Sequence, residues 1–344
     1  MNLDMLLSRG RPESYAYMYG MLSGMNARLL GRAELESVAS AGGVADAIAS
    51  LEKTDYSAEV ASLSPALSDS DVERAIERHF MRVYGEILAA LPEDDRQAFD
   101  SVILGEADLK NIKTILRGLH RSIPQSEIKL MLLSGGVPAG ITDRMAGAAG
   151  IDGAMTFLSA FWDDLPRELD GGLAGYRKTG RLVPLEMALD RSFMERWLSR
   201  KPLEDYVKMK IDSLNVLNLF RCRLEGMPYA RHIIPGGLHL SIQTLMGLET
   251  LPPGDIAASL AATPYGGRLT QASARGSISV ALVEQALEDS LEDETGLMAM
   301  VRPLSVWSAL AFLQRKQRES RQVRAALLLS GRPRRKDAAR KIIG

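Results

Sequence analysis

The chain has 344 residues, in which 42 Lys and Arg nearly balance 43 Asp and Glu, for a formal net charge of −1. This balance excludes a protein that binds nucleic acid through its overall charge, and it also excludes an acidic tail. The sole cysteine, Cys222, excludes an internal disulfide and suits a reducing compartment. The N-terminus has no signal-peptide core, and no apolar run is long enough to span a bilayer. We therefore expect a cytosolic protein without a transmembrane segment.

Apolar residues at helical spacing predict the elements of the first part of the chain. They indicate a long helix over Tyr15 to Leu30 and short helices near residues 34–39 and 45–51. A longer helix follows Asp69, which can cap it, and the sequence LPEDDRQ marks a break. The next predicted helix contains Asp108.

Glycine-rich stretches interrupt the later part of the chain. The Gly/Ala-rich residues 139–154 favour a linker, and the polar stretch from Thr263 to Ser277 favours a mobile loop. Alternating strand patterns are absent, and Ala, Leu, Met, Arg and Glu form a helix-favouring mixture. The predicted fold class is all-α.

One motif occurs three times along the chain. Asp212-x-x-Asn215 lies in the segment from Glu204 to Gly237, EDYVKMKIDSLNVLNLFRCRLEGMPYARHIIPGG. The same pattern recurs as Asp108-x-x-Asn111 and, more loosely, as Glu319-x-x-Gln322. Each copy is followed by a proline, a short segment of helical pattern and a glycine; these residues are Pro124 and Gly135, Pro228 and Gly236, and Pro333 and Gly344.

A second motif, E-x-A-(I/L)-(E/D), precedes each copy of the first. Its acidic residues are Glu73 and Glu77, Glu186 and Asp190, and Glu284 and Glu288. The two motifs are 35 positions apart in the first and third copies and 26 apart in the middle copy. A third motif, L-x-x-T-x-Y, occurs at Leu51 to Tyr56 and at Leu260 to Tyr265, and its middle copy is not recognisable.

These ordered motifs predict three small helical domains descended from one. A period of about 105 residues is too long for a solenoid repeat. The predicted boundaries are 1–138, 139–237 (with 139–156 as linker) and 238–344.

The first motif places a carboxylate and an amide on an apolar helix face. Asp108, Asn111 and Ile112 share one side of a helix, as do Asp212, Asn215 and Val216. Because burial of such groups is costly without partners, we expect an arginine, a lysine or a helix N-terminus in the same domain to pair with each aspartate. The alternative is a carboxylate for acid–base or metal chemistry. Triplication favours the structural interpretation, since an active site is rarely needed once per domain.

Known catalytic signatures are missing from the sequence. It contains no G-x-x-x-x-G-K-(S/T), no G-x-G-x-x-G after a strand and no G-x-S-x-G. Cys222 lies between Arg221 and Arg223, which could lower its pKa, but a structural helix cysteine is the favoured interpretation. No Cys, Asp or Glu beside His232 and His239 completes a set of metal ligands. A surface or satisfied histidine is the favoured interpretation for these two and for His79 and His120. We expect no catalytic, cofactor-binding or metal site.

Charge is distributed unevenly near the C-terminus. Residues 284–294 include six acidic side chains and no basic one, whereas residues 315–341 include eleven basic side chains and two acidic ones. These runs are either solvated faces that pair within the third domain or a docking surface for an acidic or membrane-adjacent partner. Aromatic residues are not interleaved with the basic ones, which disfavours nucleic acid. The candidate docking residues are Arg315, Lys316, Arg318, Arg321, Arg324, Arg334, Arg335 and Lys336.

Nearly the whole chain resembles the C subunits of the prokaryotic V-type (A/V-type) rotary ATPases, the counterparts of the eukaryotic d subunits. The stretches that carry the resemblance are YAYMYGMLSGMNARLL, ASLEKTDY, ALDRSFMERW, MKIDSLNVLNLFRCRLEGMP…IPGG and RKQRESRQVRAALLLSGRP. The segment around Asp212-x-x-Asn215 and the following Ile234 to Gly237 is the most specific.

The resemblance implies a non-catalytic rotor subunit that needs no cofactor. Its three similar subdomains are expected to form a funnel with pseudo-threefold symmetry on the cytoplasmic rim of the membrane proteolipid ring. A socket in the funnel would receive the tip of the central shaft and so couple ATP turnover to proton or sodium transport. The alternatives are an all-helical scaffold for soluble partner proteins and an unrecognised enzyme that uses the Asp/Glu faces.

Overall fold

A computed structural model describes residues 12–61, 69–162, 167–273 and 279–330. This part of the chain contains helices, turns and loops but no strand, which confirms the predicted all-α class. The helices divide into two compact units, residues 1–96 with 298–344 and residues 97–297. Helices α7 and α17 each contain residues of both units, so the chain passes from one unit to the other within continuous helices.

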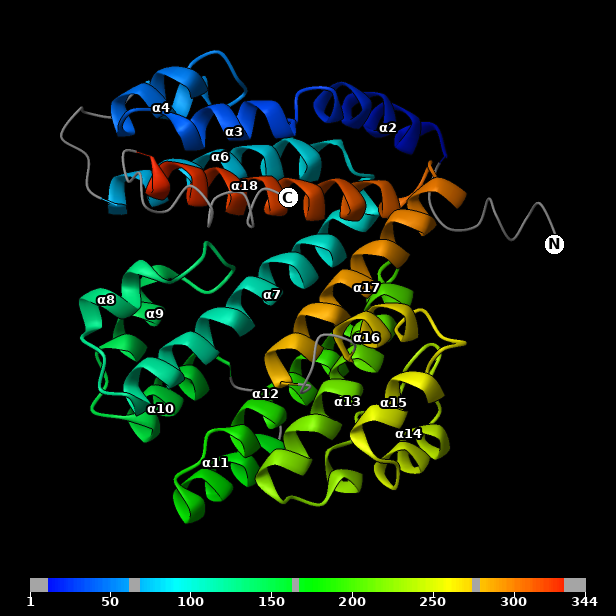
Figure 1. Ribbon diagram of the computed structural model, residues 1–344. Coiled ribbons are helices and arrows are strands. Elements are labelled where there is room, and N and C mark those ends of the chain that lie inside the picture. Colours follow the sequence, from blue (N-terminus) through cyan, green and yellow to red (C-terminus); the bar gives the residue numbers. More distant parts are fainter. Residues whose placement is uncertain (1–11, 62–68, 163–166, 274–278, 331–344) are drawn as a thin grey trace. The chain divides into compact units, whose positions relative to one another are not determined.

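Unit 1 is built from both ends of the described chain. Its N-terminal helices lie along α18, the last described helix, drawn in red in Figure 1. Tyr56 and Leu51 are buried there together with Val323, Ala326 and Leu327 of α18. The helices of this unit are α2 (Pro12–Asn26), α3 (Arg32–Ser40), α4 (Val44–Leu51), α5 (Ser57–Val60), α6 (Asp69–Ala90) and α18 (Val306–Leu329).

Unit 2 surrounds the buried helix α13. Val216, Leu219 and Cys222 of α13 pack with Leu245 and Ile256 in one apolar cluster. Three elements open this part of the chain, α7 (Glu93–His120), α8 (Gln125–Leu130) and α9 (Ala139–Ala146). They are followed by α10 (Ile151–Phe161), α11 (Arg167–Thr179), α12 (Val183–Trp197), α13 (Glu204–Glu225) and the 3-10 helix η1 (Tyr229–His232). The last are α14 (Ile242–Glu249), α15 (Pro253–Ser259), α16 (Gly266–Ser273) and α17 (Val280–Val301).

Two predictions about glycine-rich stretches are wrong. The expected linker forms α9 and α10, which bury Met145, Ala154 and Met155, and only Gly150 between them takes a positive φ, of 115°. Most of the expected loop from Thr263 is α16, which buries Leu269, while residues 274–278 lie outside the described part. In both places burial of the apolar side chains outweighs the low helix propensity of the glycines.

None of the described helices combines the length and the apolar character needed to cross a membrane.

Candidate functional site

The Asp212-x-x-Asn215 motif fastens a downstream loop to helix α13. The Asn215 amide donates to the Ile234 carbonyl oxygen at 2.8 Å and accepts from the Ile234 N–H at 2.8 Å. The Asp212 carboxylate accepts from the backbone N–H groups of residues 238, 239 and 240 at 3.0, 2.7 and 3.3 Å. It also accepts from the Tyr265 hydroxyl at 3.1 Å.

The first copy of the motif repeats this arrangement on α7. The Asn111 amide exchanges two hydrogen bonds of 2.8 Å with the backbone of Leu133. Asp108 accepts from the N–H groups of Gly136 and Val137 at 3.1 and 2.9 Å. The prediction that arginine, lysine or a helix N-terminus pairs with these aspartates is therefore wrong, because loop N–H groups and a tyrosine hydroxyl do so.

Glycine is required where each loop meets its aspartate. A Cβ atom added at Gly237 would lie 1.9 Å from Asp212 Oδ1, and one added at Gly135 would lie 2.1 Å from Asp108 Oδ1. Burial also raises the pKa of both carboxyls, that of Asp108 to about 6, although the loop N–H groups oppose the shift.

The third copy of the motif adds an ion pair within its own helix. Glu319 pairs with Lys316 at 2.9 Å, and both side chains are buried. The Lys316 ammonium also lies 4.6 Å from the centre of the Tyr56 ring. Lys316 is therefore not a surface docking residue, and that part of the prediction is wrong. Gln322 is half-buried, and the segment that follows α18, with Pro333, Arg334, Arg335, Lys336 and Gly344, lies outside the described residues.

The second motif joins each copy to the preceding one. Arg117 of α7 donates to both oxygens of the buried Glu186 of α12 at 2.6 and 2.8 Å. Hydrogen bonding to Arg117 holds the pKa of Glu186 below its usual value, even though desolvation acts in the opposite direction. Lys113 pairs with the buried Asp190 on the same two helices. The helix of the first D-x-x-N copy is thus ion-paired with the helix of the second E-x-A copy.

Ion pairs also join the second copy to the third and the third copy to the first. Arg221 of α13 lies 3.4 Å from Glu284 of α17, which joins the second copy to the third. Arg324 of α18 lies 2.5 Å from Glu73 of α6, which joins the third copy to the first. Glu77, one turn further along α6, is half-buried. The pairing order is therefore cyclic, and each contact lies within one unit.

The tyrosines of the third motif follow the same order. Tyr265 of the third copy reaches Asp212 of the second copy. The hydroxyl of Tyr56, in the first copy, lies 3.4 Å from the hydroxyl of Ser320, in the helix of the third copy. Each tyrosine thus contacts the D-x-x-N helix of the copy before it.

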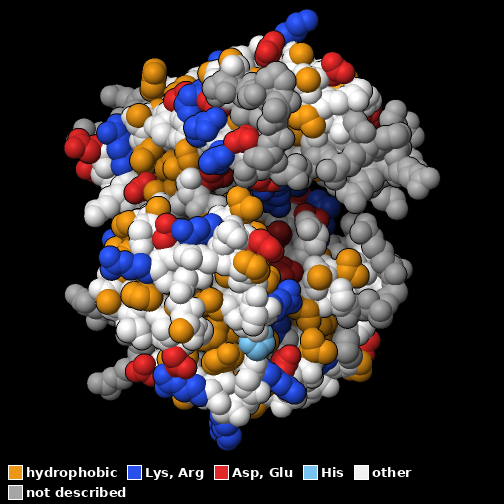
Figure 2. Space-filling view, turned by 90° about the vertical axis from the view of Figure 1, so that its left-hand side faces the viewer, with side chains coloured by type: hydrophobic (Ala, Val, Ile, Leu, Met, Phe, Trp, Pro, Cys, Tyr) orange, Lys and Arg blue, Asp and Glu red, His pale blue; other side chains and the backbone are white. Residues whose placement is uncertain are grey.

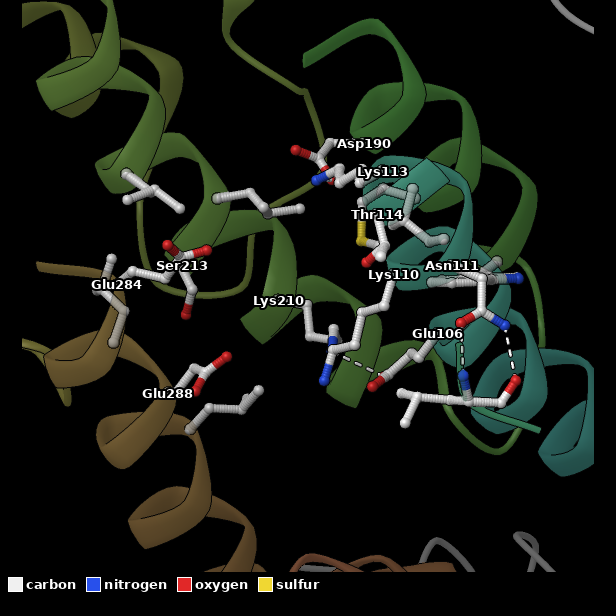
Figure 3. Close-up of a pocket in the computed structure, with 18 of the residues that line it drawn as sticks. Glu106, Lys110, Asn111, Lys113, Thr114, Asp190, Lys210, Ser213, Glu284 and Glu288 are labelled. Carbon is white, nitrogen blue, oxygen red and sulfur yellow. Dashed lines mark hydrogen bonds and ion pairs between the residues drawn. The ribbon is translucent and has the colours of Figure 1, made fainter. Parts of the chain in front are cut away.

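A cavity of about 390 Å³ opens in unit 2 between α7, α12, α13 and α17 (Figure 3). We call it the central pocket. Signature residues from the repeats line it, namely Asn111, Asp190, Glu284 and Glu288, together with Ser213 next to Asp212. Lys210 and Glu106 form an ion pair of 2.8 Å in its wall. The apolar part of the lining comprises Leu109, Met131, Leu133, Met194, Trp197, Leu214, Leu217, Leu287 and Leu291.

The motif search missed this pocket because its lining comes from four separate helices and from the segment that follows α8. A local signal was present in the basic residues Lys110, Lys113 and Arg117, which recur at offsets of 3 and 7 and so share one face of α7.

Comparison with known proteins identifies the family of this chain. The family model of the ATP synthase (C/AC39) subunit matches residues 18–328. The chain belongs to this family. It is 26% identical over 331 residues to the C subunit of the A-type ATP synthase of Thermococcus kodakarensis, covering 92% of this chain and 87% of that protein. It is 27% identical to the proteins of the same name from Methanothermobacter thermautotrophicus and Haloferax volcanii, covering 74% and 80% of this chain and 69% and 82% of those proteins.

The cysteine of this C/AC39 family member and one of its histidines, His79, are buried. Cys222 is buried, and desolvation raises its pKa to about 11, which outweighs Arg221 and agrees with the structural interpretation. His79 is buried against the Tyr56 ring and lies 3.1 Å from Glu59. Within the described ranges, no group of three or more His, Cys, Asp and Glu side chains is placed to hold a metal ion.

The basic side chains of α18 differ in exposure. Arg315, Arg318 and Arg321 are exposed, whereas Arg324 is half-buried in its pair with Glu73. On the face shown in Figure 2, basic, acidic and hydrophobic side chains are interspersed.

Proposed function

We propose that this chain is a non-catalytic central-stalk subunit of an A/V-type rotary ATP synthase. It connects the central shaft to the proteolipid ring on the cytoplasmic face of the membrane. In this role it couples ATP turnover to proton or sodium transport. The family match over residues 18–328 is the observation that carries the proposal.

The repeat organisation supports a pseudo-threefold body for this role. Three copies of two motifs pair in the cyclic order first to second, second to third and third to first. Such an order is expected of three equivalent subdomains placed around an axis, with boundaries near residues 138 and 237. A body of three such parts suits a rotor, because torque is then shared among equivalent helix pairs.

The proposal assigns no chemistry to the chain itself. The sequence contains no phosphate-binding loop of the Walker type, and phosphoryl transfer needs such a loop or an equivalent set of magnesium and phosphate ligands. We expect the purified protein to hydrolyse no nucleotide.

Docking on the partners combines charge with apolar contact. The exposed Arg315, Arg318 and Arg321, together with Arg334, Arg335 and Lys336, provide positive charge for an acidic partner surface. Exposed ion pairs contribute only about 0–1 kcal/mol each and are screened by salt. A joint that transmits torque therefore needs apolar contacts as well, and its association should weaken, without vanishing, as salt rises.

Reconstitution tests the proposal. Membranes stripped of this subunit should retain ATP turnover in the soluble sector but should not pump ions, and adding back the purified chain should restore pumping. An equal amount of an unrelated protein serves as the control. Equal pumping with and without the chain would reject the rotor role and favour a scaffold for soluble partners.

A further inference from the structure

Helix α14 of unit 2 and the loop before it carry a row of exposed apolar side chains. Leu238, Ile242 and Met246 follow one another at intervals of four residues and are 40%, 51% and 48% exposed. The last two share one face of α14, while Leu245 and Leu248 of the same helix are buried. Apolar side chains that gather on a surface mark contact sites, whereas single ones are ordinary. We call Leu238, Ile242 and Met246 the α14 row.

The first copy of the repeat builds the same loop and helix without such a row. Its counterpart of α14 is α9, which has the same length and also follows a loop held by an aspartate. Counted from the first residue of each helix, Ala139 stands where α14 has Ile242, and Asp143 stands where α14 has Met246. The apolar side chains at these two positions are therefore not required by the fold.

The surroundings of the α14 row lack negative charge. Residues 226–248 contain no Asp or Glu, although 43 of the 344 residues of the chain are acidic. The corresponding residues 123–145 of the first copy contain two acidic residues, one of them Asp143. Glu249, which follows the acid-free stretch, accepts a hydrogen bond from the Tyr229 N–H at 3.1 Å. A surface without carboxylates does not repel an anionic partner.

Positive charge lies beside the row instead. Arg231 belongs to η1, which packs against α14; it is exposed and forms no ion pair within the described residues. Arg191 of α12 donates to the Ile233 carbonyl oxygen, and its contact with Glu195 is long, at 3.9 Å. Burial lowers the pKa of His232, and the two arginines lower it further, which indicates a positive potential at this place.

An anionic lipid surface matches both properties. Its headgroups carry negative charge and its acyl chains begin just below them, so apolar side chains can enter while arginines stay among the headgroups. A second copy of the chain is a poorer match, because a stable protein interface buries about 800 Å² on each partner and three half-exposed side chains supply only part of that area. A second copy would also bring like charges together.

We propose that the α14 row and Arg231 dock on the anionic lipid surface of the membrane, with the three apolar side chains in the headgroup region. The inference rests on the proposed function, which brings the chain to the membrane, and adds a contact with lipid to its contacts with proteins. Three apolar side chains and a few charges bind a membrane weakly and reversibly. Such a contact gains strength because protein contacts already hold the chain at the membrane and raise its local concentration there.

Co-sedimentation of the purified full-length chain with sucrose-loaded vesicles tests the inference. The chain should bind phosphatidylcholine vesicles that contain phosphatidylglycerol more strongly than vesicles of phosphatidylcholine alone, and salt should weaken this binding. Met246→Asp should lower the partition coefficient at least tenfold, which corresponds to about 1.4 kcal/mol. Arg231→Gln should lower it several-fold on the anionic vesicles and hardly alter binding to the neutral ones.

The chain offers a matched control for the apolar variant. Met246→Asp gives α14 the residue type that α9 has at the same position, so this variant should fold. The control is Met300→Asp, because Met300 is 76% exposed but follows residues 284–294, which include six acidic side chains and no basic one. The control should partition within about twofold of the original chain, and all variants should melt at the same temperature.

A fluorescent label identifies what covers the row in assembled membranes. The native Cys222 is buried, so Ile242→Cys provides one reactive thiol on the row. Brominated lipids should quench a nitrobenzoxadiazole label at this position, whereas iodide in the water should quench it poorly.

Either of two results would overturn the inference. One is that Met246→Asp leaves partitioning unchanged, or that Met300→Asp loses as much. The other is a label that brominated lipids do not quench: protection from iodide would then indicate a protein partner, and quenching by iodide an uncovered surface. If reconstituted pumping still depends on the chain in these cases, the proposed function stands and only the lipid contact is lost.

Discussion

Replacement of Asp212 by alanine tests how the repeat motif stabilises the protein. The change removes the acceptor for three backbone N–H groups and for the Tyr265 hydroxyl. Residues 238 and 239 are exposed, so water can satisfy their N–H groups, whereas Leu240 and Tyr265 are buried. The Leu240 N–H is then left without a partner, and the Tyr265 hydroxyl keeps only a long hydrogen bond, 3.4 Å, to the Met209 carbonyl oxygen.

Each buried donor without a partner costs about 1–3 kcal/mol. Removal of a desolvated carboxylate, whose pKa is raised by burial, returns part of this free energy. We therefore expect Asp212→Ala to lower the free energy of unfolding by about 2–4 kcal/mol. Asp212→Asn keeps one acceptor oxygen and should lose less.

Urea unfolding followed by circular dichroism measures the effect. Ser213→Ala is the matched control, since the Ser213 hydroxyl donates only to the Met209 carbonyl of its own helix, at 3.1 Å. The control should change the free energy of unfolding by less than about 0.5 kcal/mol. A loss of less than about 1 kcal/mol in Asp212→Ala, or one equal to that of the control, would refute the view that this carboxylate holds the loop.

Two further predictions concern the same contacts. Gly237→Ala places a Cβ atom 1.9 Å from Asp212 Oδ1 and should lower the melting temperature by several degrees. The control is Gly247→Ala, on an exposed helix face with open space around it, which should leave the melting temperature equal or higher. Equal melting temperatures of the two variants would contradict the close approach of Gly237 to Asp212. The folded-state pKa of Asp108, about 6, exceeds its unfolded value, so its contribution to stability is largest below about pH 4 and is lost as pH rises through 6. From pH 4 to 7 the free energy of unfolding should therefore fall less in Asp108→Asn than in the original chain, by up to about 3 kcal/mol. Parallel curves of unfolding free energy against pH for the two proteins would reject the raised pKa of Asp108.

The sequence predicted the burial of the repeat motif but not its partners. Asp212 and Asn215 begin an apolar stripe, and both are indeed buried. Their partners are backbone N–H and carbonyl groups, which nearly every residue carries, so side-chain patterns do not identify them. The relevant signal was the glycine beside each loop, such as Gly237, because only an absent side chain allows such a close approach.

Sequence patterns also did not predict which side chains form ion pairs between copies. The E-x-A motif placed Glu186 and Glu284 correctly on helices, yet the arginines that meet them, Arg117 and Arg221, lie 69 and 63 positions away. Tertiary packing decides which residues meet at such large separations in sequence. The third copy departed furthest, since Glu319 pairs with Lys316 one turn before it on the same helix.

The core of unit 1 cannot close until the last described helix has been synthesised. Leu51 and Tyr56 are made early, but the side chains that cover them, Val323, Ala326 and Leu327, belong to the last described helix to leave the ribosome. Contacts of such high sequence separation form slowly and leave apolar surface open meanwhile. Unit 2, whose residues 97–297 are contiguous, has no such dependence and can close first. A nascent chain interrupted before α18 therefore leaves the apolar side chains of this core uncovered.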